Sequence, residues 1–228
     1  IEIFSGGFIG VDVFFVISGY LITSVLIEDI ENKEFSIINF YERRARRILP
    51  AFFFMIFSCI IIGWFILTPY FYRDLFQTTF ATSIFSSNIL LYIKSGYFAP
   101  ISELKPFLHT WSLAVEEQYY VLFPILLIFF WRFGRFTTLC LLGGLFTISL
   151  LLSEWLLNYD TNANFYLLPS RAWELLAGSI ASFIVYKKGI KKNNIFALLG
   201  ISAIFISIFF FDEKTPFPSF YTLIPVLG

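Results

Sequence analysis

Long apolar runs are the feature that most constrains this chain. The first, Gly6 to Ile27, contains one charged residue, Asp12, and is long enough to cross the roughly 30 Å hydrocarbon core of a bilayer as a helix. Five more follow, at Ile48 to Thr68, Ser112 to Trp131, Phe136 to Leu157, Tyr166 to Tyr186 and Ile195 to Phe211. Hydrophobic residues make up 58% of the chain, against about 45 to 50% in soluble domains. The pattern predicts an all-α, polytopic transmembrane helix bundle with about six complete spans and the start of a seventh near Tyr221.

The distribution of lysine and arginine predicts the orientation of these spans, because loops on the inner side carry an excess of both. One arrangement places most of the 16 cations inside. The inner ones are Lys33, Arg43, Arg44, Arg46, Arg47, Arg132, Arg135, Lys187, Lys188, Lys191 and Lys192, and the outer ones are Arg73, Lys94, Lys105, Arg171 and Lys214. This arrangement requires that Leu75 to Ile93 does not cross, so we interpret that stretch as a re-entrant or surface helix. The net charge of zero gives no sign of a nucleic-acid partner.

Several carboxylates fall within the apolar runs, and three of them are candidates for a site or for structural pairing. An ionised carboxylate at mid-bilayer costs about 2.5 to 3.5 kcal/mol, so such residues pair, face the protein interior or act on a substrate. Asp12 lies in the first run, and Glu116 and Glu117 lie in the third. In a helix Glu116 shares a face with Ser112 and Tyr120, whereas Glu117 points about 100° away. We expect Asp12 and Glu116 to be catalytic and Glu117 to make a structural pair.

Four arginines gather in the five positions 43 to 47, directly before the second run. One interpretation is an inner-surface anchor under the positive-inside rule. The other basic inner loop, Lys187 to Lys192, uses lysine alone, whereas arginine offers a planar fork that binds phosphate at two points. If this stretch is helical, Arg44 and Arg47 share a face. We expect these two to bind a polyphosphate donor such as a coenzyme A thioester.

Further polar residues gather at the predicted outer ends of the spans. The only histidine, His109, is either a capping or loop residue or a group that binds an acceptor or handles protons. Arg171 and Glu174, three residues apart, form a buried ion pair or bind substrate. With one histidine and with Cys59 and Cys140 inside apolar runs, we expect neither a metal site nor a disulfide. The predicted substrate-binding residues are His109, Trp111, Ser112, Tyr120, Arg171 and Glu174.

Five stretches, in this order and spacing, resemble the acyltransferase 3 family of integral-membrane O-acyltransferases that modify extracytoplasmic glycans. They are GGFIGVDVFFVISGYLIT from Gly6, FYERRARRILP from Phe40, SSNILLYIKSGYF from Ser86, LKPFLHTWSLAVEEQYYVLFP from Leu104 and FYLLPSRAWELLAG from Phe165.

The resemblance implies about ten spanning helices, a cytoplasmic acyl-CoA, chiefly acetyl-CoA, as co-substrate, no permanently bound cofactor, and a sugar hydroxyl outside as acceptor. It also implies that Arg44 and Arg47 match the family's R-x-x-R-I-x-P motif. The family's essential histidine lies in a helix that precedes GGFIG. We therefore expect residues 1–228 to form one membrane acyltransferase domain that is truncated at both ends.

These observations predict a multi-pass enzyme of the bacterial inner membrane. It would acylate a hydroxyl of lipopolysaccharide O-antigen, an exopolysaccharide or peptidoglycan, with acyl-CoA, the glycan or a lipid-linked saccharide, and the bilayer as its partners. Two alternatives remain open. One is a transporter or flippase of lipid-linked saccharides, with Asp12, Glu116 and Arg171 along its path. The other is a non-enzymatic membrane scaffold or sensor.

The arginine motif yields a first testable prediction. Replacing Arg44 and Arg47 together by lysine keeps the inner positive charge but removes both planar forks, so acyl transfer should fall while insertion and orientation persist. Transfer is measured with labelled acyl-CoA in membranes, and orientation by accessibility of loop residues. Full activity in the double lysine variant would reduce the motif to an anchor.

Overall fold

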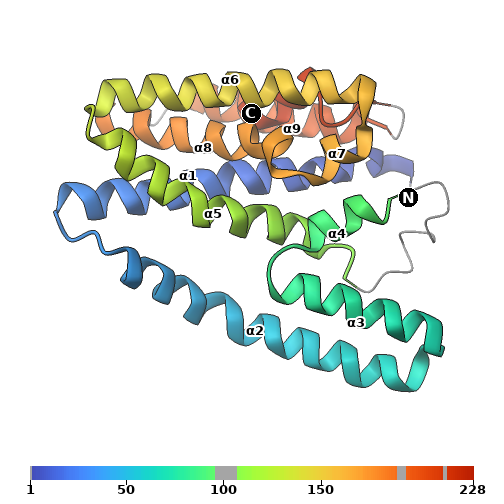
Figure 1. Ribbon diagram of the computed structural model, residues 1–228. Helices are drawn as coiled ribbons and strands as arrows, with labels where there is room; N and C mark the ends of the chain where they lie inside the picture. The colour runs from blue at the N-terminus through green and yellow to red at the C-terminus, as the bar shows by residue number, and fades with distance from the viewer. Residues whose placement is uncertain (1, 96–106, 189–193, 213–214) are drawn as a thin grey trace. The chain divides into compact units, whose positions relative to one another are not determined.

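The structure is a computed structural model that describes residues 2–95, 107–188, 194–212 and 215–228 (Figure 1). Within these residues every regular element is a helix, as the sequence predicts. Four cations used for the orientation lie outside the described residues, namely Lys105, Lys191, Lys192 and Lys214. The same holds for residues 96–98 and 104–106 of two of the recognised stretches.

The chain forms two compact units. The first comprises Ile1–Glu28 and Tyr119–Gly228, and the second comprises Asp29–Gln118. The described helices, in chain order, are η1 (Glu2–Ile9), α1 (Gly10–Glu31), α2 (Ile37–Ile66), α3 (Pro69–Ser83), α4 (Ser87–Ile93), α5 (Thr110–Trp131), α6 (Arg135–Tyr159), α7 (Thr161–Tyr166), α8 (Leu168–Lys188), α9 (Asn194–Phe210), η3 (Phe220–Thr222) and α10 (Leu223–Leu227). One boundary between the units falls within α1, after Glu28, and the other falls within α5, after Gln118.

Four helices of the described residues are long and apolar enough to cross a membrane: Gly6–Glu31, Ile37–Ile66, Thr110–Trp131 and Arg135–Tyr159. They coincide with the first four predicted spans and make the chain a multi-pass membrane protein. Helices α8 and α9, at the fifth and sixth predicted spans, are not among these four. Helix α8 has 21 residues but carries Arg171 and Glu174 in its first two turns, and α9 is apolar but has only 17 residues. The helix that contains the second span begins at Ile37, before the predicted apolar run, and includes the four arginines.

The stretch predicted not to cross the membrane is broken into two short helices. Helices α3 and α4 meet at Phe85, whose φ of 51° lies in the left-handed region that a continuous helix cannot contain. The 15 residues of α3 extend over about 22 Å, which is less than the hydrocarbon core. This geometry agrees with a re-entrant or surface segment.

Helices α1 and α8 of the first unit approach each other at two glycines. A Cβ atom on Gly19 would lie 1.9 Å from the Leu175 carbonyl oxygen, and one on Gly178 would lie 1.9 Å from the Val16 carbonyl oxygen. The two backbones therefore approach closely at these glycines. Elsewhere in this unit Gly6 packs against the α9 backbone, whereas a Cβ on Gly10 would meet nothing within 4 Å.

Hydroxyl groups connect the same two helices to the middle of α5. Ser179 of α8 accepts a hydrogen bond from Thr23 of α1 at 2.7 Å and is hydrogen-bonded to the Tyr119 hydroxyl at 2.8 Å. The hydroxyls of Ser18 and Tyr120 are hydrogen-bonded to each other as well. Apolar association gives little specificity between helices surrounded by lipid, so such interhelical hydrogen bonds help to fix their register.

The second unit is held by an apolar contact between α2 and α3. Phe52 and Ile56 of α2 pack with Leu75 of α3 and with Phe107, and all four are buried. Much of the remaining α2 surface is exposed and aromatic, as lipid contact requires, with Phe54, Trp64 and Phe65 more than two-thirds exposed.

The α1–α8 contact yields a second prediction. Gly178→Ala places a methyl group on the Val16 carbonyl and forces the helices apart, which should lower the free energy of unfolding by about 1 to 3 kcal/mol. Gly144→Ala in α6 is the matched control, because a Cβ there meets nothing within 4 Å. Thermal unfolding of the solubilised protein measures both variants. Equal unfolding temperatures would show that the two helices are not closely packed.

Candidate functional site

The first unit contains a buried cluster of three charged side chains. Asp12 lies in the first turn of α1, and Arg171 and Glu174 lie one turn apart on α8. Arg171 Nη1 donates to Asp12 Oδ1 at 2.7 Å and to Glu174 Oε1 at 2.9 Å. All three side chains have no exposed surface. The predicted ion pair between Arg171 and Glu174 is therefore present, and Asp12 joins it from another helix.

Aromatic rings enclose the guanidinium of this cluster. The Arg171 guanidinium carbon lies 5.1 Å from the ring centroid of Phe165 and 4.7 Å from that of Phe217, which are cation–π distances. Arg171 Nε also donates to the Phe165 carbonyl at 3.2 Å. The side chain is thus fixed by contacts on several sides.

The charges in this cluster do not balance, because one guanidinium faces two carboxylates. Asp12 Oδ2 and Glu174 Oε2 are buried and accept no hydrogen bond from any group that the structure describes. Buried acceptors without a donor are costly, particularly in a medium of low dielectric constant. Each of these buried oxygens can therefore hold a proton without giving up a hydrogen bond to a described group.

A second cluster of one guanidinium and two carboxylates lies in the second unit. Arg44 of α2 donates from Nε to Glu117 Oε1 at 3.3 Å and from Nη2 to Glu116 Oε1 at 3.5 Å. The Glu116 side chain is 6% exposed and the Glu117 side chain 12%. The two glutamates were predicted to have different partners, but both contact the same guanidinium, because its nitrogens reach the two neighbouring positions of α5. Their separate roles stay a prediction.

The arginine run is helical, as the predicted shared face of Arg44 and Arg47 requires, yet its members differ. Arg43 pairs with Asp29 at 2.6 Å, Arg46 pairs with Glu42 at 2.7 Å, and Arg44 contacts the two glutamates. Arg47 is exposed and makes no ion pair with any described residue. Within the described chain, Arg47 is thus the member of the run whose charge is available to an anionic ligand.

The remaining predicted site residues lie along α5 or just before it. His109 is exposed in the turn that precedes α5, and its carbonyl accepts from the Ser112 hydroxyl at 3.2 Å. Trp111 is buried, and Tyr120 is buried in the first unit, where it contacts Ser18. The Ser112 hydroxyl is thus bonded to the backbone of His109, and the substrate roles of all four residues stay predictions.

Sequence reasoning missed three contributors to these contacts. Ser179 connects α1, α5 and α8 through hydroxyls, and Phe165 and Phe217 hold the Arg171 guanidinium. Nothing separates these residues by type from the many serines and phenylalanines of an apolar chain. Only their proximity in the fold reveals them.

Comparison with known proteins identifies the class. Residues 1–226 match the family described as an acyltransferase domain, and the chain belongs to that family. The protein is therefore a membrane acyltransferase, which argues against the alternatives of a transporter and of a non-enzymatic scaffold. No solved structure gives a significant match.

Several proteins are similar over most of the chain. An uncharacterized protein of Haemophilus influenzae is 36% identical and aligns with 93% of this chain and 92% of its own length. The O-acetyltransferase OatA of Staphylococcus aureus is 34% identical over 90% of this chain, and the putative peptidoglycan O-acetyltransferase YrhL of Bacillus subtilis is 31% identical over 93%. The chain spans only about a third of the length of the latter two, 36% in each case.

The buried cluster yields a third prediction. Arg171→Met leaves two buried carboxylates without their cation and should cost about 3 to 5 kcal/mol of folding free energy, so little folded protein should reach the membrane. Combining it with Asp12→Asn and Glu174→Gln removes both negative charges and should recover most of the folded protein. Yield and unfolding temperature measure the effect. A single variant as stable as the unchanged protein would mean that the cluster is not buried.

Proposed function

We propose that this protein is an O-acyltransferase of the bacterial inner membrane that transfers an acetyl group from cytoplasmic acetyl-CoA to a hydroxyl of an extracytoplasmic glycan. The observation that carries the proposal is the family match over residues 1–226, together with similarity to proteins named O-acetyltransferases. Peptidoglycan is the first acceptor to test, because the name of the YrhL relative specifies it. Lipopolysaccharide and other surface polysaccharides are the next acceptors to test.

In the proposed reaction the sugar hydroxyl oxygen attacks the thioester carbonyl carbon. The new C–O bond forms, the C–S bond breaks, and coenzyme A leaves as its thiol after taking up a proton. The hydroxyl proton goes to a general base, because an alcohol is a weak nucleophile until deprotonated. Asp12 and Glu116 are both held by arginines, which suits carboxylates that orient a base or stabilise its positive charge.

For the donor we propose that the phosphates of acetyl-CoA bind at the arginine run. The exposed Arg47 supplies a planar fork whose charge no described carboxylate neutralises, and Arg44 lies one turn before it. On the orientation drawn from the lysines and arginines, this end of α2 faces the cytoplasm, where acetyl-CoA is made.

A fourth prediction tests the reaction and the donor site together. Membranes containing the protein as its gene encodes it should transfer labelled acetyl groups from acetyl-CoA to the glycan fraction, as esters that mild alkali releases. Arg47→Ala should raise the KM for acetyl-CoA about 10-fold or more, since it removes charge-assisted hydrogen bonds.

Arg46→Ala is the matched control, because Arg46 is also exposed but is paired with Glu42. It should leave the KM for acetyl-CoA unchanged. Absence of alkali-labile label in the glycan would refute the proposed reaction. Equal effects of the two substitutions would refute the assignment of Arg47.

A further inference from the structure

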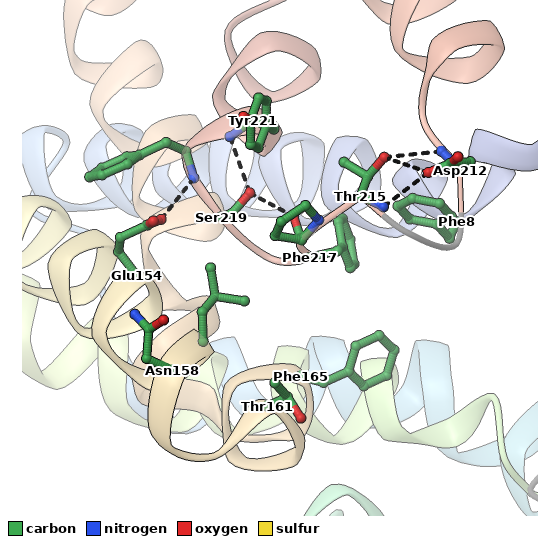
Figure 2. Close-up of a pocket in the computed structure, with 13 residues that line it drawn as sticks. Phe8, Glu154, Asn158, Thr161, Phe165, Asp212, Thr215, Phe217, Ser219 and Tyr221 are labelled. Carbon is green, nitrogen blue, oxygen red and sulfur yellow. Dashed lines mark hydrogen bonds between the residues drawn. The ribbon is translucent and has the colours of Figure 1, made fainter.

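A pocket of about 850 Å³ opens within the first unit, at one end of α6 (Figure 2). Its volume lies within the range of about 300 to 1,000 Å³ that is usual for small-molecule sites. Residues of α6 and α7 face the segment from Thr215 to Tyr221 across the open space, as Figure 2 shows. None of the residues predicted from the sequence to bind substrate lines this pocket.

The walls combine aromatic rings with neutral polar groups and carboxylates. The aromatic residues are Phe8, Phe165, Phe217, Phe220 and Tyr221. The polar residues are Glu154, Asn158, Thr161, Asp212, Thr215 and Ser219. A sugar ring presents apolar C–H faces and a rim of hydroxyl groups. Aromatic faces suit the first, and amide, hydroxyl and carboxylate groups suit the second.

The charge of the pocket lining indicates which of the two substrates of the proposed reaction the pocket suits. Its thirteen described residues include two carboxylates, Glu154 and Asp212, and neither lysine nor arginine. Such a surface repels the phosphates of a nucleotide donor and favours a ligand that donates hydroxyl hydrogen bonds. The described part of the lining therefore favours a polyhydroxylated ligand.

Some polar side chains of the pocket make hydrogen bonds within the protein, and others make none with any described residue. Glu154 Oε2 accepts from the Phe220 backbone N–H at 3.2 Å, and Thr215 closes a turn with Asp212 at 3.0 Å. Asn158 and Thr161 are exposed, and their side chains make no hydrogen bond with any described residue. Asn158 lies one turn after Glu154 on α6, so the two share a face. The amide of Asn158 and the hydroxyl of Thr161 are available to a ligand.

The pocket is firmly built and adjoins the buried charged cluster. Asn164 Nδ2 donates to the Pro218 carbonyl at 2.9 Å, and the rings of Phe8 and Phe217 lie edge to face at 4.6 Å. Phe165 and Phe217 line the pocket and also flank the Arg171 guanidinium. A ligand in the pocket is thus separated from the Asp12–Arg171–Glu174 cluster by little more than two aromatic rings.

We infer that this pocket binds the saccharide acceptor, with Asn158 and Thr161 hydrogen-bonding its hydroxyls and Tyr221 packing on a sugar face. The identification of this saccharide as the acceptor rests on the proposed function. Binding of a saccharide to the pocket can nevertheless be tested without transfer. The orientation drawn from lysine and arginine places this end of α6 on the outer side, where a surface glycan is found.

The fifth prediction concerns acceptor kinetics. The acceptor is the soluble oligosaccharide fraction that muramidase and mild acid release from the producing cell's own envelope. Asn158→Ala, Thr161→Ala and Tyr221→Ala should each raise the apparent KM for this fraction about 5- to 10-fold, with the KM for acetyl-CoA unchanged.

Two substitutions outside the pocket serve as controls. Asn162→Ala removes an exposed amide of α7 that does not line the pocket, and Tyr159→Ala removes an exposed ring that stacks on Trp155 instead. Both should leave both KM values unchanged. Pocket variants that leave the acceptor KM unchanged, or that raise the KM for acetyl-CoA instead, would overturn the inference.

A binding measurement keeps the inference testable if the protein transfers nothing. Asn158→Cys is made in a variant with Cys59→Ser and Cys140→Ser and is labelled with a membrane-impermeant maleimide added outside. The envelope oligosaccharides at saturating concentration should slow labelling about fivefold or more, whereas coenzyme A should not, and Asn162→Cys should be unaffected by either. Protection without transfer would support the pocket while refuting the proposed reaction. Lack of protection, or protection by coenzyme A alone, would overturn the pocket.

Discussion

A charge placed among membrane helices has to be compensated by the protein itself, and in the first unit Arg171 does this. Its guanidinium holds Asp12 and Glu174 and lies between the rings of Phe165 and Phe217. The contact joins α1 to α8 across 159 positions of sequence, where the backbones already meet at Gly19 and Gly178. Packing of small residues lets the helices approach closely, and any other register would be destabilised because it would break the ion pairs.

Each unit repeats one chemical arrangement, a single guanidinium that faces two carboxylates. In the first unit the partners come from α1 and α8, and in the second Arg44 of α2 meets neighbouring glutamates of α5. In the first unit, Asp12 Oδ2 and Glu174 Oε2 can receive a proton without first losing a hydrogen bond to a described group. That property suits the acyl transfer proposed above, in which a proton has to move.

Much of this fold follows from local pattern. The apolar runs located the long helices, the cost of intramembrane charge singled out Asp12 and Glu116, and a spacing of three predicted the Arg171–Glu174 pair. The contact of Asp12 with Arg171 could not be predicted, because it depends on which helices become neighbours. Helical periodicity separated Glu116 from Glu117, yet a long arginine side chain reaches both. The pocket could not be predicted from the sequence. It combines the ends of α6 and α7 with the residues around Pro218, and these residue types are common in any loop.

Helix α2 has a consequence for the lipids around it. The helix begins at Ile37, eleven residues before the apolar run at Ile48, so about 16 Å of it extends beyond the part that matches the hydrocarbon core. The arginine run lies within or beside this part of the helix, and the phosphodiesters of lipid headgroups resemble the phosphates that we propose it binds. If the run binds acetyl-CoA as proposed, anionic lipids that reach Arg47 would compete with it, and the lipid composition of the host membrane would then affect how much acetyl-CoA is bound.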